Sequence, residues 1–192
     1  MPKRTRFTIW RPLATAAAAA LMAMFLVPTT AQAGPGASGP RESTPVYSYD
    51  NAVREAVWVD TGLDLDRDGS HDRVAVDIVR PREAAAEGRK VPVIMDASPY
   101  YSCCGRGNES QKKTYDASGN MVQAPLYYDN YFVPRGYAFV GVDLAGTNRS
   151  DGCVDVGGRS DILSAKAVVD WLNGRARGYT SRTGDTRSRA TT

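Results

Sequence analysis

The stretch VGVDLAGTNRSDG at residues 140–152 decides how this 192-residue chain is interpreted. Small apolar residues lead to Asp143, and a Gly-Thr pair and a Ser-Asp-Gly turn follow it. This pattern predicts a buried strand that carries polar side chains to the loop at its carboxyl end, where α/β proteins usually bind ligands. It also makes Ser150, in that loop, the first candidate for a nucleophile.

The segments around this stretch predict the fold class. Two near-continuous apolar runs indicate strands covered on both faces, VPVIMDA at residues 91–97 and GYAFVGVDLAG at residues 136–146. Alternating apolar residues predict two earlier strands, within residues 55–63 and 72–81. Apolar residues at helical spacing predict a helix within residues 157–174. An antiparallel start that runs into a strand–helix pattern predicts an α/β fold with a mixed, doubly wound sheet.

The first 33 residues have the three parts of a secretory signal. A basic start is followed by the apolar run LATAAAAALMAMFLV and by the cleavage motif AQA at residues 31–33. The apolar run is shorter than the roughly 20 residues that a membrane-spanning helix needs. We therefore predict a secreted, extracellular protein with no membrane span after cleavage of the signal peptide.

Composition divides the rest of the chain into three parts. Residues 34–45, GPGASGPRESTP, predict a flexible linker, residues 46–178 form one domain, and residues 179–192 are predicted to be a disordered tail rich in Arg and Thr. The formal net charge of +3 includes the basic leader. No basic stripe alternates with aromatic residues, so nucleic-acid binding is not expected. The sequence does not indicate an oligomeric state.

The chain has three cysteines. Export to an oxidising environment permits a disulfide, and the odd count leaves one thiol over. A bridge between the neighbours Cys103 and Cys104 would strain the peptide that joins them. Because Cys153 follows the second apolar run as the pair follows the first, we predict that Cys153 is bonded to Cys103 or Cys104.

The turn DLDRDGSHD leaves two alternatives open. Its carboxylates stand at positions one, three, five and nine of a calcium loop, with glycine at six; they are Asp64, Asp66, Asp68 and Asp72. Position twelve, where an EF-hand has its bidentate glutamate, is Ala75. A turn rich in aspartate and glycine also forms without a metal, as a plain hairpin turn. We expect no cofactor apart from calcium under the first alternative.

Four long segments carry a resemblance to a known family. They are VIMDASPYYSCCGRGNES, YDNYFVPRGYAFVGVDLAGTNRSDGC, GGRSDILSAKAVVDWLNGRA and GYTSRTG. Together they resemble the N-terminal part of the catalytic domain of secreted Xaa-Pro dipeptidyl-peptidases, the serine hydrolase family that also includes bacterial cocaine esterase. The resemblance covers about residues 53–184. It implies an α/β-hydrolase core with a Ser-Asp-His triad in that chain order.

The resemblance also implies which catalytic parts lie inside the chain. The family's nucleophile occupies a G-x-S-x-G elbow, and no such motif occurs here. The single histidine, His71, lies far upstream of the family's catalytic histidine, and Ser150 follows no elbow, so neither is expected to belong to a triad. The family's Pro-Tyr motif matches Pro99 and Tyr100. Tyr100 is therefore expected to supply one hydroxyl donor of the oxyanion hole, with Tyr101 as the nearest alternative.

These implications lead to one principal prediction and two alternatives. Residues 46–178 are expected to be the N-terminal part of a secreted serine dipeptidyl-peptidase domain, an incomplete α/β-hydrolase fold truncated before the nucleophile elbow. The complete enzyme would act on peptides with proline at the second position, and this chain alone would be inactive. An esterase or acylase of the same superfamily is one alternative. A non-catalytic exported protein that binds calcium is the other.

Overall fold

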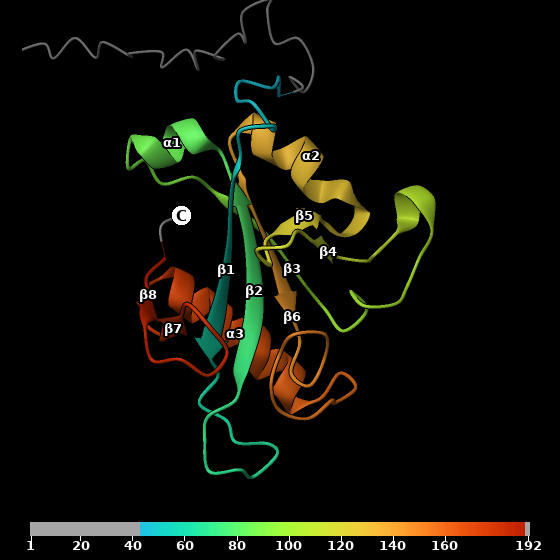
Figure 1. Cartoon of the computed structure of the whole chain (residues 1–192), viewed down its shortest axis with the longest axis vertical. Coiled ribbons are helices and arrows are strands. Elements are labelled where there is room, and N and C mark those ends of the chain that lie inside the picture. The colour runs from blue at the N-terminus through green and yellow to red at the C-terminus, as the bar shows by residue number, and fades with distance from the viewer. Residues whose placement is uncertain (1–42, 191–192) are drawn as a thin grey trace, which may run out of the picture. The chain divides into compact units, whose positions relative to one another are not determined.

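A mixed six-stranded sheet organises the part of the chain that this computed structural model describes, residues 43–190 (Figure 1). The predicted signal peptide, residues 1–33, and residues 34–42 of the predicted linker lie outside the described residues. In chain order the elements are β1 (Val53–Asp60), β2 (Arg73–Arg80), α1 (Arg82–Ala86), β3 (Val93–Ser98), η1 (Gly107–Glu109), β4 (Thr114–Tyr115), β5 (Met121–Gln123), η2 (Pro125–Tyr127), α2 (Tyr128–Phe132), η3 (Val133–Arg135), β6 (Ala138–Asp143), α3 (Arg159–Leu172), β7 (Gly178–Tyr179) and β8 (Arg187–Ser188), where η marks a 3₁₀ helix.

The strand order in the sheet is β3-β6-β2-β1-β7-β8. β1 and β2 pair in antiparallel fashion, and β2 also pairs with β6 in antiparallel fashion. β3 and β6 are parallel, from the pair Val93 and Ala138 to the pair Ser98 and Asp143. The prediction of a mixed sheet with antiparallel N-terminal strands is confirmed. Because β3 and β6 run in parallel with matched ends, the loops that follow them start side by side.

Both faces of the sheet are covered, as the apolar runs predict. Residues at alternate positions of a strand point to opposite faces, so Val76 and Ile78 pack with Trp171 of α3, whereas Val79 packs with Met121 on the other face. Figure 1 shows α3 alongside the lower half of the sheet and α2 near its upper end. Among residues 43–190, no helix is long and apolar enough to cross a membrane.

The long connection between β3 and β6 contains more structure than a loop. It forms the two-stranded β4–β5 sheet and the helix α2. Met121 and Val133 from this connection are fully buried and pack with Phe139 of β6. Much of the connection therefore covers one face of the sheet.

Part of the predicted disordered tail, residues 179–190, takes part in short strand pairings in the structure. Tyr179 pairs with Trp58 at the edge of β1, and Arg187 pairs with Tyr179. Two guanidinium groups contact the Tyr179 ring, with Arg73 3.6 Å and Arg187 4.6 Å from its centroid. Backbone pairing at a sheet edge and cation–π contacts need no apolar run, so the polar composition of this segment does not indicate these pairings.

Candidate functional site

A pocket of about 600 Å³ opens at the carboxyl ends of β3 and β6. The loop after β3 contributes Pro99, Tyr100 and Ser102 to its wall. The loop after β6 and the first turn of α3 contribute the rest, including Asn148 and Asp161. The pocket lies where the parallel strands end, which is the position that the stretch 140–152 predicts for a ligand site.

The structure separates the two tyrosines that the sequence left as competitors. The Tyr100 side chain lines the pocket and is 52% exposed. Tyr101 is 1% exposed, and its hydroxyl donates to the main-chain oxygen and to Oδ2 of Asp96, both at 2.9 Å. Burial raises the pKa of the Tyr101 hydroxyl far above its ordinary value, and the Asp96 carboxylate adds to the increase. Tyr101 is therefore a packing residue, and Tyr100 is the tyrosine that can reach a bound molecule.

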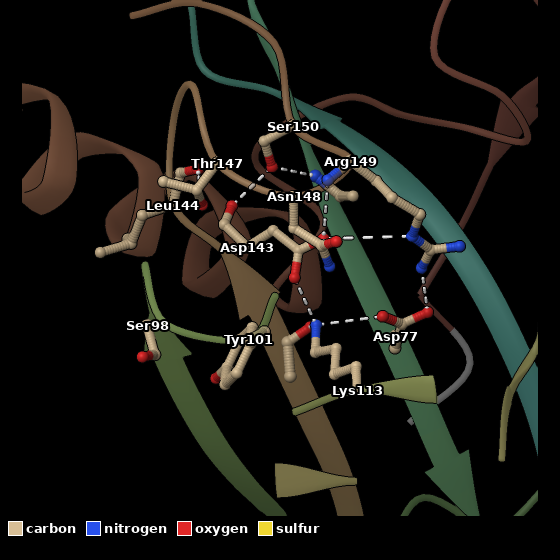
Figure 2. A network of polar contacts seen from close by, with 12 residues as sticks. Asp77, Ser98, Tyr101, Lys113, Asp143, Leu144, Thr147, Asn148, Arg149 and Ser150 are labelled. Atoms are coloured by element: carbon tan, nitrogen blue, oxygen red, sulfur yellow. Dashed lines mark hydrogen bonds and ion pairs between the residues drawn. The ribbon is translucent and has the colours of Figure 1, made fainter. Parts of the chain in front are cut away.

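Ser150 joins two strands. Its buried hydroxyl donates to the main-chain oxygen of Asp143 at 2.6 Å and accepts from the main-chain N–H of Ala75 at 2.8 Å. Figure 2 shows this hydroxyl directed toward the end of β6. A serine held by both neighbours inside the protein cannot attack a substrate, so the geometry agrees with the prediction that Ser150 is not the nucleophile.

A buried ionic network lies below the pocket, and sequence reasoning missed it. The Lys113 ammonium, from the connection between β3 and β6, lies 2.7 Å from Oδ1 of Asp143 and 3.0 Å from Oδ2 of Asp77 (Figure 2). It also donates to the Gly141 carbonyl at 3.0 Å. The side chains of Lys113, Asp77 and Asp143 are all 0% exposed, and the Arg149 guanidinium pairs with Asp77 from the partly exposed side. The sequence feature that could have indicated this network is an aspartate within each of two apolar strands, Asp77 in β2 and Asp143 in β6.

The network is tied to the pocket wall. Asn148 lines the pocket. Its side-chain amide donates to Oδ2 of Asp143 at 3.0 Å and to the Tyr115 hydroxyl at 2.9 Å. Burial raises the pKa of the Asp143 carboxyl above its ordinary value, and the Lys113 ammonium is the largest influence in the opposite direction. The network therefore holds the loop after β6, through Asn148, against Asp143 at the end of that strand.

The acidic turn brings together three of its four candidate calcium ligands. Oxygen atoms of Asp64, Asp66 and Asp72 lie within 4.8 Å of one another. Asp68 is outside this group, and its carboxylate accepts from the Ser70 N–H at 2.7 Å. Burial raises the pKa of the Asp72 carboxyl, and the neighbouring carboxylates add to the increase. The hydrogen bond from the Leu65 N–H to Oδ2 of Asp72, at 2.8 Å, has the opposite effect on this pKa. The donor set suits calcium, but each of these carboxylates also accepts a backbone N–H, so calcium binding stays a prediction.

The predicted bridge from Cys153 is absent from the structure. Cys103 and Cys104 are bonded to each other, and Cys153 is a free, exposed thiol. The N–H groups of Cys103 and Cys104 both donate to the Tyr100 carbonyl, at 3.2 and 3.3 Å. This tight turn brings the two neighbouring side chains together, whereas Cys153 lies on the loop after β6. The strain expected in a bridge between neighbouring cysteines argued against Cys103–Cys104, and residue types alone do not predict the turn that forms here.

A pocket at the ends of two parallel strands, in a mixed sheet covered on both faces, defines an α/β protein with a strand-end ligand site. The chain belongs to the X-Pro dipeptidyl-peptidase family (S15 family), whose pattern matches residues 68–186. The resemblance inferred from the sequence is confirmed. The family match includes both pocket loops and the Tyr100 position.

Curated relatives share this family. A putative Xaa-Pro dipeptidyl-peptidase of Streptomyces avermitilis is 74% identical over 194 residues, which cover 100% of this chain and 28% of the relative. A putative Xaa-Pro dipeptidyl-peptidase of Bacillus anthracis is 39% identical, over 70% of this chain and 23% of the relative. A CocE/NonD family hydrolase from Staphylococcus aureus matches in structure with a TM-score of 0.38 and 18% identity, over 69% of this chain and 26% of that chain. The chain thus spans about a quarter of the length of these relatives.

Proposed function

We propose that this chain is the N-terminal part of a secreted serine dipeptidyl-peptidase that releases N-terminal Xaa-Pro dipeptides through an acyl-enzyme. The nucleophile, the acid and the histidine of its triad come from sequence beyond these 192 residues. Three facts support this: the family membership, the span of 28% of the Streptomyces relative, and the absence of G-x-S-x-G from the sequence. The chain alone is then inactive.

The position of Tyr100 carries the proposal. Acyl transfer passes through a tetrahedral oxyanion, which needs hydrogen-bond donors already in place. Tyr100 is exposed in a pocket at the strand ends, and its neighbour Tyr101 anchors the backbone at that point through its bonds to Asp96. We expect the Tyr100 hydroxyl to donate to the oxyanion from this pocket, and the second donor to be the N–H that follows the nucleophile.

The single histidine does not serve this pocket. His71 lies in the acidic turn, where its Nδ1 is 3.1 Å from Oδ1 of Asp60. It lines two pockets that do not include Tyr100. A general base must reach the reacting group within hydrogen-bond distance. The triad histidine is therefore expected outside this sequence.

The charge in the pocket suits a peptide with a free amino terminus. Asp155 and Asp161 line the pocket, and none of its lining residues is cationic. A protonated α-amine in this pocket would face carboxylates and a tyrosine hydroxyl. This favours a dipeptidyl-peptidase over an esterase or acylase that acts on uncharged substrates on the same scaffold.

A chimera tests the proposal. We define the chimera as the Streptomyces avermitilis relative with its aligned segment replaced by this chain. The chimera is expected to cleave Ala-Pro-p-nitroanilide and the isolated chain is not. Because a free amine is required, N-acetylated Ala-Pro-p-nitroanilide and simple p-nitrophenyl esters should be poor substrates. Preference for the esters would favour the esterase alternative, and turnover by the repurified isolated chain would contradict the division of the triad.

Export is proposed on the signal-like sequence of residues 1–33. Expression of the complete chain in an actinobacterial host should release a protein that begins near Gly34. N-terminal sequencing of the protein in the culture medium then identifies the cleavage site. Retention of the leader in the cell fraction would contradict the proposal.

A further inference from the structure

The backbone of Tyr100 is held on both of its sides. Its N–H donates to Oγ of Ser98, the last residue of β3, at 3.2 Å. Its carbonyl accepts from the N–H groups of Cys103 and Cys104, at 3.2 and 3.3 Å. The Tyr100 side chain lines the pocket and is half exposed, so the position of its ring depends on how firmly this backbone is held.

The two residues that hold the Tyr100 carbonyl are themselves joined by a disulfide. The Cys104 carbonyl accepts from the Gln111 N–H at 2.9 Å, which ties Cys104 to the rest of the connection between β3 and β6. Cys103 is exposed, and its Sγ lies 3.7 Å from the Tyr100 carbonyl oxygen. The bridge therefore links the exposed residue of the turn to a residue that is held from a second side.

We propose that the Cys103–Cys104 disulfide positions Tyr100 for catalysis. The bridge keeps the turn closed on the Tyr100 carbonyl, and the closed turn keeps the hydroxyl at the place where the oxyanion forms. Neither cysteine is among the residues that line the pocket, so both are positioning residues that act through Tyr100. The inference rests on the proposed function, in which Tyr100 is an oxyanion donor.

A displacement of about 1 Å in a reacting group can lower a rate roughly 10²-fold. An opened turn leaves Tyr100 in the pocket but less well placed, so the loss of the bridge should cost less than the loss of the hydroxyl. The bridge is also open to reductants, because Cys103 is exposed and exposed disulfides are the more easily reduced ones.

The isolated chain, prepared without reductant, tests the bridge and the turn without any assay of activity. Trypsin places both cysteines in the peptide 91–106, whose mass is lower by that of the two thiol hydrogens when the bridge is present. After reduction by dithiothreitol, we expect the N–H groups of Cys103 and Cys104 to exchange with deuterium at least about tenfold faster, while those of β6 do not change. Two free thiols before treatment, or equal exchange before and after it, overturns the proposal.

In the chimera, reduction should change kcat rather than KM. Dithiothreitol gives two electrons and two protons to the bridge and becomes a cyclic disulfide. It should lower kcat about tenfold and leave KM within about twofold, because an oxyanion donor acts on the transition state. A chimera with Cys103→Ser and Cys104→Ser together should have the same low kcat and no response to dithiothreitol. Cys153→Ser is the matched control and should behave as the wild type, because Cys153 is outside the bridge.

Tyr100→Phe separates positioning from general support of the fold. In a chimera with Tyr100→Phe, loss of the bridge should change kcat by less than about twofold, because no hydroxyl is left to displace. An equal fall in kcat with and without the hydroxyl, an unchanged kcat in the reduced chimera, or a change in KM alone overturns the proposal. An inactive untreated chimera would instead contradict the proposed function, and hydrogen exchange in the isolated chain would still decide whether the bridge holds the turn.

Discussion

Replacing Lys113 by Met is the sharpest test of the ionic network below the pocket. The substitution keeps the length of the side chain and removes an ammonium that contacts Asp143, Asp77 and the Gly141 carbonyl. Breaking a buried ion pair by removing one partner costs about 3–5 kcal/mol, because a charge is left buried without compensation. Arg149 still pairs with Asp77, so the lower end, about 3 kcal/mol, is expected.

Urea unfolding followed by circular dichroism measures this loss. With an m value of about 2 kcal/mol/M, a loss of about 3 kcal/mol lowers the midpoint by about 1.5 M. Lys112→Met is the matched control, because Lys112 is exposed and surface substitutions usually change stability by less than about 0.5 kcal/mol. Equal midpoints for the two variants would refute the reasoning.

The pH dependence of the same variant gives a second readout. Burial raises the pKa of Asp143, and Lys113 is the largest opposing influence, so removing Lys113 raises this pKa further. Between this raised pKa and the lower pKa of the unfolded chain, the folded variant holds a proton on Asp143 that the unfolded chain has released. The deficit against the wild-type chain therefore becomes smaller as the pH falls through the folded pKa of Asp143 toward its pKa in the unfolded chain, so it should be smaller in mild acid than at neutral pH. A deficit that grows in acid would contradict this assignment.

Three further tests concern the pocket and the acidic turn. Tyr100→Phe in the chimera should lower kcat roughly 10²–10³-fold, the range for one lost oxyanion donor, while the exposed Tyr131→Phe leaves kcat unchanged; full activity of Tyr100→Phe would contradict its role as an oxyanion donor. Ser150→Ala should destabilise the chain by about 1–3 kcal/mol in urea unfolding, because it leaves the buried N–H of Ala75 without an acceptor; an unchanged midpoint would show that the link between the strands is unimportant. Under the calcium alternative, added Ca²⁺ raises the thermal midpoint of the wild-type chain but not of Asp72→Asn; a midpoint independent of Ca²⁺ favours the metal-free turn.

Much of the fold could be predicted from local patterns. The apolar runs at residues 91–97 and 136–146 predicted two covered strands, and these are the parallel pair β3 and β6. The alternation in residues 72–81 predicted β2. Side-chain burial repeats every two residues in a strand, so a short window of sequence is enough to reveal it. The family was also recognisable, because its long matching segments contain the loops that line the pocket.

The features that the sequence missed all depend on residues that are distant in the chain or on the path of the backbone. β7 and β8 have no apolar run; β7 pairs with β1, β8 pairs with β7, and two arginines contact the Tyr179 ring. The Cys103–Cys104 bridge depends on a turn around the Tyr100 carbonyl, which residue types alone do not specify.

The sequence by itself determined the class of fold and the place of the pocket, because periodicity is a local property, and its resemblance to the family indicated the Pro-Tyr pair as the candidate donor. Only the tertiary structure decided that Tyr100 faces the pocket while Tyr101 is buried. It alone also brought Lys113 between Asp77 and Asp143. The physical reason is that a buried charge is tolerated only beside its partners, and those partners come from strands and a connection that meet only when the sheet has formed.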